Sequence, residues 1–185
     1  MLGFCTAIFN GEHMVIILNG PPGSGKDALA RMVMPQLQVT QLEFKKPLQE
    51  QVRKLIGMSK KEFYSHYEDR EWKELKQFNG HSCRDLMIWM SEEVIKPKFG
   101  KDFFGKAIAS QILPNKNYIF SDGGFKDEVQ IVKDHCEAIG QKLFLVHLYR
   151  NGTSFDGDSR NYIEDFPEIT YKLSNNGALM DAVKV

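Results

Sequence analysis

Short apolar runs of strand length alternate along the chain with longer stretches that carry apolar residues at helical spacing. The run MVIILN at 14–19 is continuous and rich in β-branched residues, as expected of a strand buried on both faces. Further strands are predicted at 37–44, 117–122, 142–149 and 168–177, the last with its turn. Helices are predicted at 26–34, stopped by Pro35, through 47–104, and at 126–140 and 178–185. This alternation predicts one three-layer α/β domain, a five-stranded parallel sheet with helices on both faces.

Composition narrows the class of protein without naming a function. The 185 residues are 42% hydrophobic, which is enough for a packed core. Lys plus Arg and Asp plus Glu both number 24, so contact with nucleic acid would need a local basic patch. Cys5, Cys83 and Cys136 are widely spaced and odd in number, which favours reduced structural thiols and a cytoplasmic location.

The sequence shows neither the apolar run of a membrane protein nor the signal peptide of a secreted one. No apolar run approaches the roughly 18 residues that span a bilayer, so we expect a soluble protein without a membrane partner. Residues 1–13 lack the basic start and cleavage site of a signal peptide. We interpret 1–13 as an N-terminal extension or an upstream start, and 14–185 as the domain.

The segment LNGPPGSGKDALAR at 18–31 matches the phosphate-binding pattern G-x-x-x-x-G-K between a predicted strand and a predicted helix. Backbone N–H groups of such a loop and the helix N-terminus surround phosphate groups, and Lys26 would reach the β- and γ-phosphates of ATP. Asp27 stands where Ser or Thr usually holds Mg²⁺; a carboxylate is an equally hard ligand, although Asp27 could instead only complement the helix dipole. The predicted ATP-binding residues are Gly20, Pro21, Pro22, Gly23, Ser24, Gly25, Lys26, Asp27 and Ala28.

Five segments in order resemble a known family: GPPGSGKD, LEFKKPLQEQV, RDLMIWMSEEVIKPKFGKDFFGKAI, FSDGGFKDE and NNGALMDAV. Together they are similar to the phage deoxynucleoside monophosphate kinases, and within that group to the phage kinases that phosphorylate 5-hydroxymethyluracil in DNA. The resemblance covers 14–185. It implies the P-loop nucleotide-kinase fold, an inserted helical acceptor-side region at 47–113, a lid-like loop at 150–161, ATP with Mg²⁺, and action in the cytoplasm of the host cell.

One departure from that family bears on the acceptor. The monophosphate kinases carry Asp-x-Arg-Phe after the third strand, whereas SDGGFKDE has Gly124 at the position of the arginine. Loss of a bidentate phosphate contact fits a hydroxyl acceptor carried on a polymer better than a free nucleotide. Transfer to 5-hydroxymethyluracil in DNA, a step in thymidine hypermodification, is therefore the first hypothesis, and a deoxynucleoside monophosphate kinase is the alternative.

Catalytic groups are expected where strands end, because ligands of open α/β sheets bind there. Asp122 is the first candidate for holding Mg²⁺ or accepting the acceptor's proton, with a helix-capping role as the alternative. Glu43, near the end of the second strand, is the rival base or else a solvated edge residue. Arg150 and Arg160 in the lid-like loop are candidates to stabilise the transferring phosphoryl group, or are simple loop cations.

The acceptor-side region offers cations and aromatic rings. Arg70, Lys73 and Arg84 are candidate acceptor contacts, although charges on a helix usually face solvent. An extruded base could stack on Trp72, Trp89, Phe103 or Phe104, with core packing favoured for Trp89. Contacts to DNA could come from Lys45, Lys46, Lys60 and Lys61.

Two other classes of protein fit the phosphate-binding loop. A P-loop NTPase switch or motor would want a Glu beside the Asp of the third strand, and YIFSDGG has none. A non-catalytic nucleotide-binding module would not need Lys26. A kinase therefore fits the sequence best.

Overall fold

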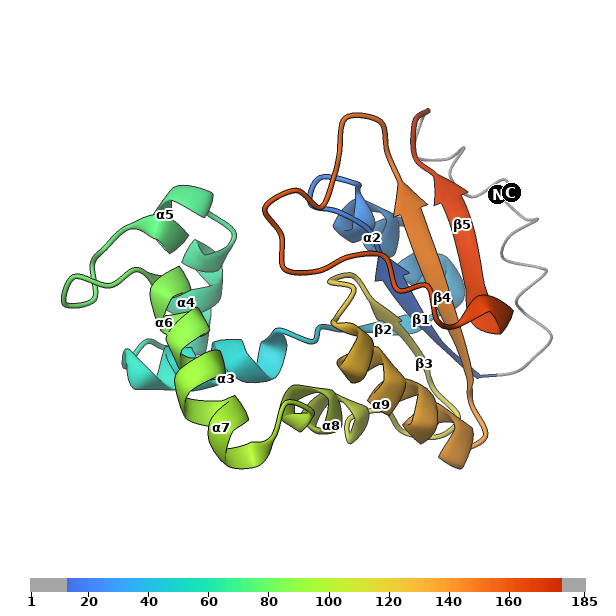
Figure 1. Cartoon of the computed structure of the whole chain (residues 1–185), viewed down its shortest axis with the longest axis horizontal. Coiled ribbons are helices and arrows are strands. Elements are labelled where there is room, and N and C mark those ends of the chain that lie inside the picture. The colour runs from blue at the N-terminus through green and yellow to red at the C-terminus, as the bar shows by residue number, and fades with distance from the viewer. Residues whose placement is uncertain (1–12, 178–185) are drawn as a thin grey trace.

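The computed structural model describes residues 13–177 and confirms the expected fold class. Its five strands form one parallel sheet in the order β2-β3-β1-β4-β5. The strands are β1 (Met14–Asn19), β2 (Val39–Leu42), β3 (Asn117–Phe120), β4 (Lys142–Tyr149) and β5 (Thr170–Ser174). Figure 1 shows the sheet on one side of the molecule and a separate group of helices on the other.

Every residue of the central strand β1 is buried, because other elements pack on both of its faces. Val15 and Ile17 point into a core built with α8 (Phe103–Ala109) and α9 (Lys126–Ala138), while Ile16 and Leu18 meet α2 (Lys26–Leu37) on the opposite face. The continuous apolar run of the sequence is thus explained by helices on both sides of the sheet.

The helix after the phosphate-binding loop runs further than expected. We expected Pro35 to stop it, but α2 continues through Pro35 to Leu37. Proline removes its own N–H from the helical ladder. Leu37 is buried in the core against β2, and this packing holds the last turn in place.

The predicted helical stretch 47–104 is a series of short helices rather than one long one. Their bounds are α3 (Lys46–Leu55), α4 (Lys60–Tyr67), α5 (Arg70–Glu74), α6 (Cys83–Trp89), the π-helix η1 (Met90–Ile95) and α7 (Lys96–Phe99), followed by α8. We call residues 46–99 the helical unit. It has a core of its own around Val52, Phe63 and Cys83.

Several predicted boundaries were too long. The strand expected at 37–44 is limited to β2, and the strand expected at 117–122 ends at Phe120. The first residues of the strand expected at 168–177 belong to the 3₁₀ turn η2 (Pro167–Ile169), and β5 starts at Thr170. Cys83 and Cys136 are free and buried, as expected of structural thiols. Residues 1–12, with Cys5, and the predicted helix at 178–185 lie outside the described residues. Between residues 13 and 177 no helix has the length and hydropathy to cross a membrane.

Candidate functional site: a phosphate-binding cleft

The phosphate-binding loop lies between the carboxyl end of β1 and the first turn of α2. Gly23 and Gly25 have φ of 79° and 96°, in the left-handed region that side chains other than glycine rarely adopt. A Cβ atom on Gly20 would lie 2.6 Å from the carbonyl oxygen of Leu148 in β4, so a side chain is excluded there as well. The glycine spacing is thus a steric requirement of this loop.

Lys26 begins α2 and lies in the loop. Its Nζ donates to the carbonyl oxygens of Gly20 and Pro21 at 2.6 and 2.8 Å. Burial, together with the positive charge of Arg160, lowers the pKa of Lys26 to about 8. A bound triphosphate would replace these neutral carbonyl partners with anionic oxygens and favour the charged form of the lysine.

Two distant segments hold the loop in shape. Asn175, which follows β5, donates from Nδ2 to the carbonyl oxygen of Ser24 at 2.8 Å, and Arg150 donates to the carbonyl oxygen of Gly23 at 3.1 Å. Ser24 is fully buried and its Oγ has no hydrogen-bond partner. Nothing in the spacing of the sequence indicated the role of Asn175.

Asp122 follows β3, beside the loop. Its Oδ2 accepts from the backbone N–H of Lys45 at 3.0 Å, and its Oδ1 is shielded from solvent without any partner. Burial raises the pKa of Asp122. The alternative role as a helix cap does not hold, because Glu128 accepts from the Phe125 N–H at the start of α9.

Arg160 lies in the predicted lid-like loop and reaches the sheet. Its guanidinium group makes two hydrogen bonds to the carboxylate of Asp158, at 2.9 and 2.7 Å, and one to the carbonyl oxygen of Asp122 at 2.9 Å. The bonds between the two side chains raise the pKa of Arg160 and lower that of Asp158. Sequence reasoning missed Asp158, although an acid two residues before a predicted site arginine was a usable signal.

One cleft of about 890 Å³ brings most of the predicted site residues together. The phosphate-binding loop contributes Lys26 and Asp27, the end of β3 contributes Asp122, and the segment after β4 contributes Asp158 and Arg160. From the helical unit come the three predicted acceptor contacts, Arg70, Lys73 and Arg84.

Two predicted catalytic residues do not line this cleft. Glu43 instead accepts from Gln41 at 3.5 Å and lies 3.9 Å from the Lys45 ammonium group, and burial raises its pKa. Arg150 lines a second hollow of about 580 Å³ beside Pro21, Tyr149 and Tyr162. Of the two candidate bases, Asp122 lines the cleft and Glu43 does not.

Sequence reasoning missed further residues that line the cleft. Arg31 lies one turn beyond Asp27 on α2, a spacing that could have indicated a shared face. Lys45, proposed only as a DNA contact, lines the cleft together with Tyr67 and Met87. Of the predicted cations, Arg84 forms an exposed ion pair with Glu74 at 3.2 Å.

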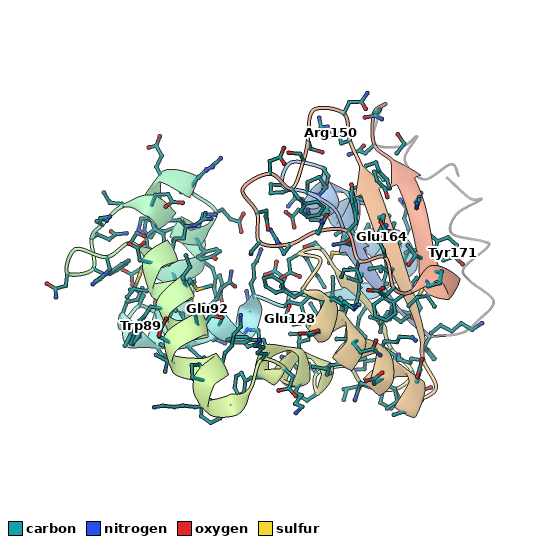
Figure 2. All side chains as sticks on the ribbon, viewed as in Figure 1. Trp89, Glu92, Glu128, Arg150, Glu164 and Tyr171 are labelled. Carbon is teal, nitrogen blue, oxygen red and sulfur yellow. The ribbon has the colours of Figure 1, made fainter. Side chains whose placement is uncertain are left out.

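None of the four aromatic residues proposed to stack on a base lines the main cleft. Trp72 packs in the helical unit against Phe63, His66 and Phe78. Trp89, expected in the core, is 44% exposed on the outer side of the helical unit (Figure 2). At 100° per residue Trp89 lies about 120° from Cys83 around α6, away from the face that carries Leu86 and Met87 into the core of the helical unit.

The two remaining aromatic residues, Phe103 and Phe104, form the start of α8. Phe103 packs between Phe99 and Phe104, with ring centroids 5.3 and 5.4 Å apart. Phe104 is 3% exposed and lines a smaller cavity next to the cleft. The lysines proposed to bind DNA do not form one group. Lys45 lines the cleft, whereas Lys60 and Lys61 are exposed on α4.

Gly124, where the resemblance led us to expect an arginine, lies against an aromatic ring. Its φ is 61°, and a Cβ atom there would lie 2.7 Å from the ring of Phe44. Phe44 itself is buried and packs on Phe120, with ring centroids 4.7 Å apart. This backbone and this ring make any side chain at position 124 sterically unfavourable.

The donors available for Mg²⁺ are few. Among the described residues, no group of three His, Cys, Asp or Glu side chains could hold a metal ion. The unpartnered Oδ1 of Asp122, the unpartnered Oγ of Ser24 and the carboxylate of Asp27 are oxygen donors around the phosphate-binding loop. One or two carboxylates fit Mg²⁺ that takes its other ligands from phosphates and water.

Comparison with known proteins finds distant likenesses only. No family model and no curated protein matches the chain. Among solved structures, a gluconokinase from Sinorhizobium meliloti is 11% identical, with 94% of this chain and 87% of that chain covered and a TM-score of 0.46. A hexameric APS kinase from Thiobacillus denitrificans is 14% identical, with 94% and 27% covered and a TM-score of 0.43. A protein from Chloroflexus aurantiacus is 15% identical, with 76% and 61% covered and a TM-score of 0.43. The chain thus spans less than two thirds of the last two structures.

Proposed function

We propose that this protein is an ATP-dependent kinase. The phosphate-binding loop, Arg160 and the carboxylate of Asp122 line one cleft, and cations of the helical unit line the same cleft. A switch or a passive nucleotide-binding module would not need the acceptor-side residues Arg70, Lys73 and Arg84 in that cleft. Phosphoryl transfer depends mainly on positioning and on charge stabilisation, and the cleft supplies both.

The acceptor that we propose is the hydroxymethyl group of 5-hydroxymethyluracil in phage DNA. The observation that carries this proposal is Gly124, since the Phe44 ring excludes the arginine that would bind an acceptor phosphate. A hydroxyl acceptor needs no such contact beside the reacting atoms. The sugar-phosphate backbone of the DNA would pass the cations on the helical unit and Lys45.

In the proposed reaction the hydroxymethyl oxygen attacks the γ-phosphorus of ATP in line. A new P–O bond forms, the bond to the β,γ-bridging oxygen breaks, and ADP leaves. Asp122 takes the proton of the alcohol, because its Oδ1 is free and its pKa is raised by burial. Lys26 and Arg160 offset charge on the transferring group.

Mg²⁺ would be held by Asp27, and it supplies charge neutralisation on the β- and γ-phosphates when bound. Asp122 is the alternative Mg²⁺ ligand, and in that case its Oδ1 does not act as the base. Ser24 is less available, because its side chain is fully buried. Asp27 is exposed at the start of α2, where a carboxylate can meet a phosphate-bound ion.

One observation favours the alternative acceptor, a free deoxynucleoside monophosphate. Arg31, Arg70, Lys73 and Arg84 all line the main cleft, and Arg84 pairs there with the cleft residue Glu74 at 3.2 Å. Such a cluster could bind a monophosphate without an arginine at position 124.

A phosphate-transfer panel separates the two acceptors. ATP labelled in its γ-phosphate is offered each deoxynucleoside monophosphate, free 5-hydroxymethyldeoxyuridine, plain DNA, and DNA that contains 5-hydroxymethyluracil. We expect most of the label in the hydroxymethyluracil DNA, less in the free nucleoside, which lacks the backbone phosphates, and none with Lys26→Ala. Diphosphate formation from a monophosphate, with no label in that DNA, would establish the alternative.

A further inference from the structure

The smaller cavity that Phe104 lines has a volume of about 140 Å³ and adjoins the main cleft. We call it the small cavity. Lys45, Asp122 and Arg160 line both spaces, so the small cavity opens beside the carboxylate that we propose as the base. Its far walls come from two parts of the fold, the helical unit and the start of α9. Figure 2 shows Glu92 and Glu128, one from each part, near the junction of the two.

The small cavity is the right size for part of a ligand. Sites that enclose a whole small molecule have roughly 300–1,000 Å³. A water molecule occupies about 30 Å³ in the liquid, so this cavity has room for about four or five waters, or for one heteroaromatic ring. The sugar and phosphates of a nucleotide would have to remain in the larger cleft.

The apolar walls suit a planar ring. Phe44, Phe104, Phe125 and Leu48 line the cavity, and among the three rings Phe125, which is 42% exposed, offers the most surface to a ligand. Gly124 also lines it, and any side chain at this position would meet the Phe44 ring. Stacking on aromatic and apolar side chains is how proteins hold a base taken out of a nucleic-acid stack.

The polar lining offers both hydrogen-bond donors and acceptors. Glu92 accepts from Lys96 at 2.5 Å and from Ser91 at 2.9 Å, so a carboxylate, an ammonium and a hydroxyl group are held together at one wall. Glu128, 8% exposed, lines the cavity from α9 and caps that helix through one oxygen. A uracil-type edge presents O4 and O2 as acceptors on either side of the N3–H donor. Ser91 and Lys96 both donate to Oε1 of Glu92, so the edge would be met by the remaining N–H groups of Lys96 and by the second carboxylate oxygen of Glu92.

We propose that this small cavity binds the pyrimidine ring of the acceptor, with its Watson–Crick edge toward Ser91, Glu92 and Lys96. The inference rests on the proposed function and adds where the acceptor's base lies. In a pyrimidine the sugar-bearing N1 and the substituted C5 both flank C6. A ring inserted with C6 at the mouth therefore directs both its sugar and its 5-hydroxymethyl group toward the main cleft, where Asp122 lies.

This orientation discriminates between acceptors. The hydroxymethyl oxygen would emerge beside Asp122, whereas the 5′-phosphate of a nucleotide in the same pose would be separated from the ring by the sugar. A purine has two fused rings and would fit the small cavity less well. The cavity therefore selects a single-ring base with a nucleophile on C5.

The test measures nucleoside binding without any transfer. With ATP omitted, titration calorimetry follows 5-hydroxymethyl-2′-deoxyuridine, deoxyguanosine and deoxyribose 5-phosphate. We expect the first to bind at least tenfold more tightly than the other two. Ser91→Leu fills the cavity and Lys96→Met removes a donor, and each should weaken this binding at least tenfold. Ser65→Leu and Lys98→Met, at exposed positions outside the cavity, should leave it unchanged.

The outcomes separate this inference from the proposed function. Selective nucleoside binding that both cavity variants abolish supports the cavity even if no label enters hydroxymethyluracil DNA. Label transfer with an unchanged KM for that DNA in Ser91→Leu and Lys96→Met would overturn the cavity and leave the kinase. If Ser91→Leu does not fold, Lys96→Met alone decides, and equal binding of the three probes to the native protein also overturns the inference.

Discussion

The Nη1 atom of Arg160 donates to the backbone carbonyl oxygen of Asp122 at 2.9 Å. This bond links the segment after β4 to the residues that follow β3, and both ends of the bond line the cleft. Asp158 holds the other side of the guanidinium group through two further bonds. An arginine fixed from both sides loses little conformational freedom when phosphate binds, and this favours charge stabilisation during transfer.

Arg160→Ala is expected to lower kcat by about 100-fold or more, because a preorganised donor to the transferring group is lost. Arg150→Ala is the comparison, since Arg150 bonds the Gly23 carbonyl and lines the second hollow rather than the cleft. We expect it to change mainly the KM for ATP. Steady-state rates measure both, and equal losses of kcat would contradict the assignment.

ATP binding should weaken as pH rises past about 8. Lys26 has a pKa lowered to about 8 by burial and by Arg160, so the free protein loses this positive charge above that pH. Binding must then take up a proton, and log Kd should rise with a slope approaching one per pH unit. Calorimetry from pH 7 to 9.5 in buffers of different ionisation heat measures both effects.

Lys26→Arg is the control for that pH dependence. An arginine stays charged throughout this range, so the Kd of this variant should be weaker overall but flat with pH. A slope in Lys26→Arg equal to that of the native protein would assign the titration to another group.

Asp27→Asn should raise the Mg²⁺ concentration for half-maximal rate by about tenfold, because a charged oxygen ligand is lost. The matched control is Asp127→Asn. Asp127 also lies in the first turn of a helix, α9, but not in the cleft, so it tests the helix-dipole effect alone. An equal metal dependence in both variants would leave only that effect for Asp27.

Gly124→Ala is expected to destabilise the protein more than Gly140→Ala. Both glycines have positive φ, 61° and 69°, and each substitution should cost about 1–2 kcal/mol for the left-handed backbone. Nothing lies within 4 Å of a Cβ atom on Gly140, whereas the Phe44 ring lies 2.7 Å from one on Gly124. Overpacking should add about 1–3 kcal/mol.

Urea unfolding measures this difference between the two glycine variants. Phe44→Leu combined with Gly124→Ala should recover part of the extra loss, because a smaller side chain relieves the contact. Equal destabilisation of the two glycine variants would show that the ring does not restrict position 124.

Local patterns predicted the parts of this molecule that depend on neighbours in sequence. The run at 14–19 indicated a strand buried on both faces, and the glycine spacing predicted the loop that surrounds Lys26. Strand ends indicated Asp122, because parallel strands bring their carboxyl ends to one edge of the sheet.

Contacts between distant segments could not be predicted in this way. Asn175 bonds Ser24 across 151 residues, and Gly124 meets Phe44 only because β2 and β3 are neighbours in the sheet. Pro35 marked a helix end by local rules, but burial of Leu37 outweighed the lost hydrogen bond. Trp89 was misplaced because the residues 86–90 are all apolar, and such a run does not show which face of the helix meets the core.

The π-helix η1 holds one residue more than an α-helix of the same number of turns. The N–H of Lys96 donates to the carbonyl oxygen of Ser91, five residues back rather than four. One extra residue in a continuous α-helix would rotate all that follows it by about 100°. The wider turn of η1 absorbs that rotation, so α7 keeps the phase of α6, and Lys96 stays near the Phe125 ring, whose centroid lies 5.6 Å from its ammonium group. Removing one residue within η1 should therefore leave a plain α-helix with α7 still facing α9, so the chain can change its length here without reorienting that wall.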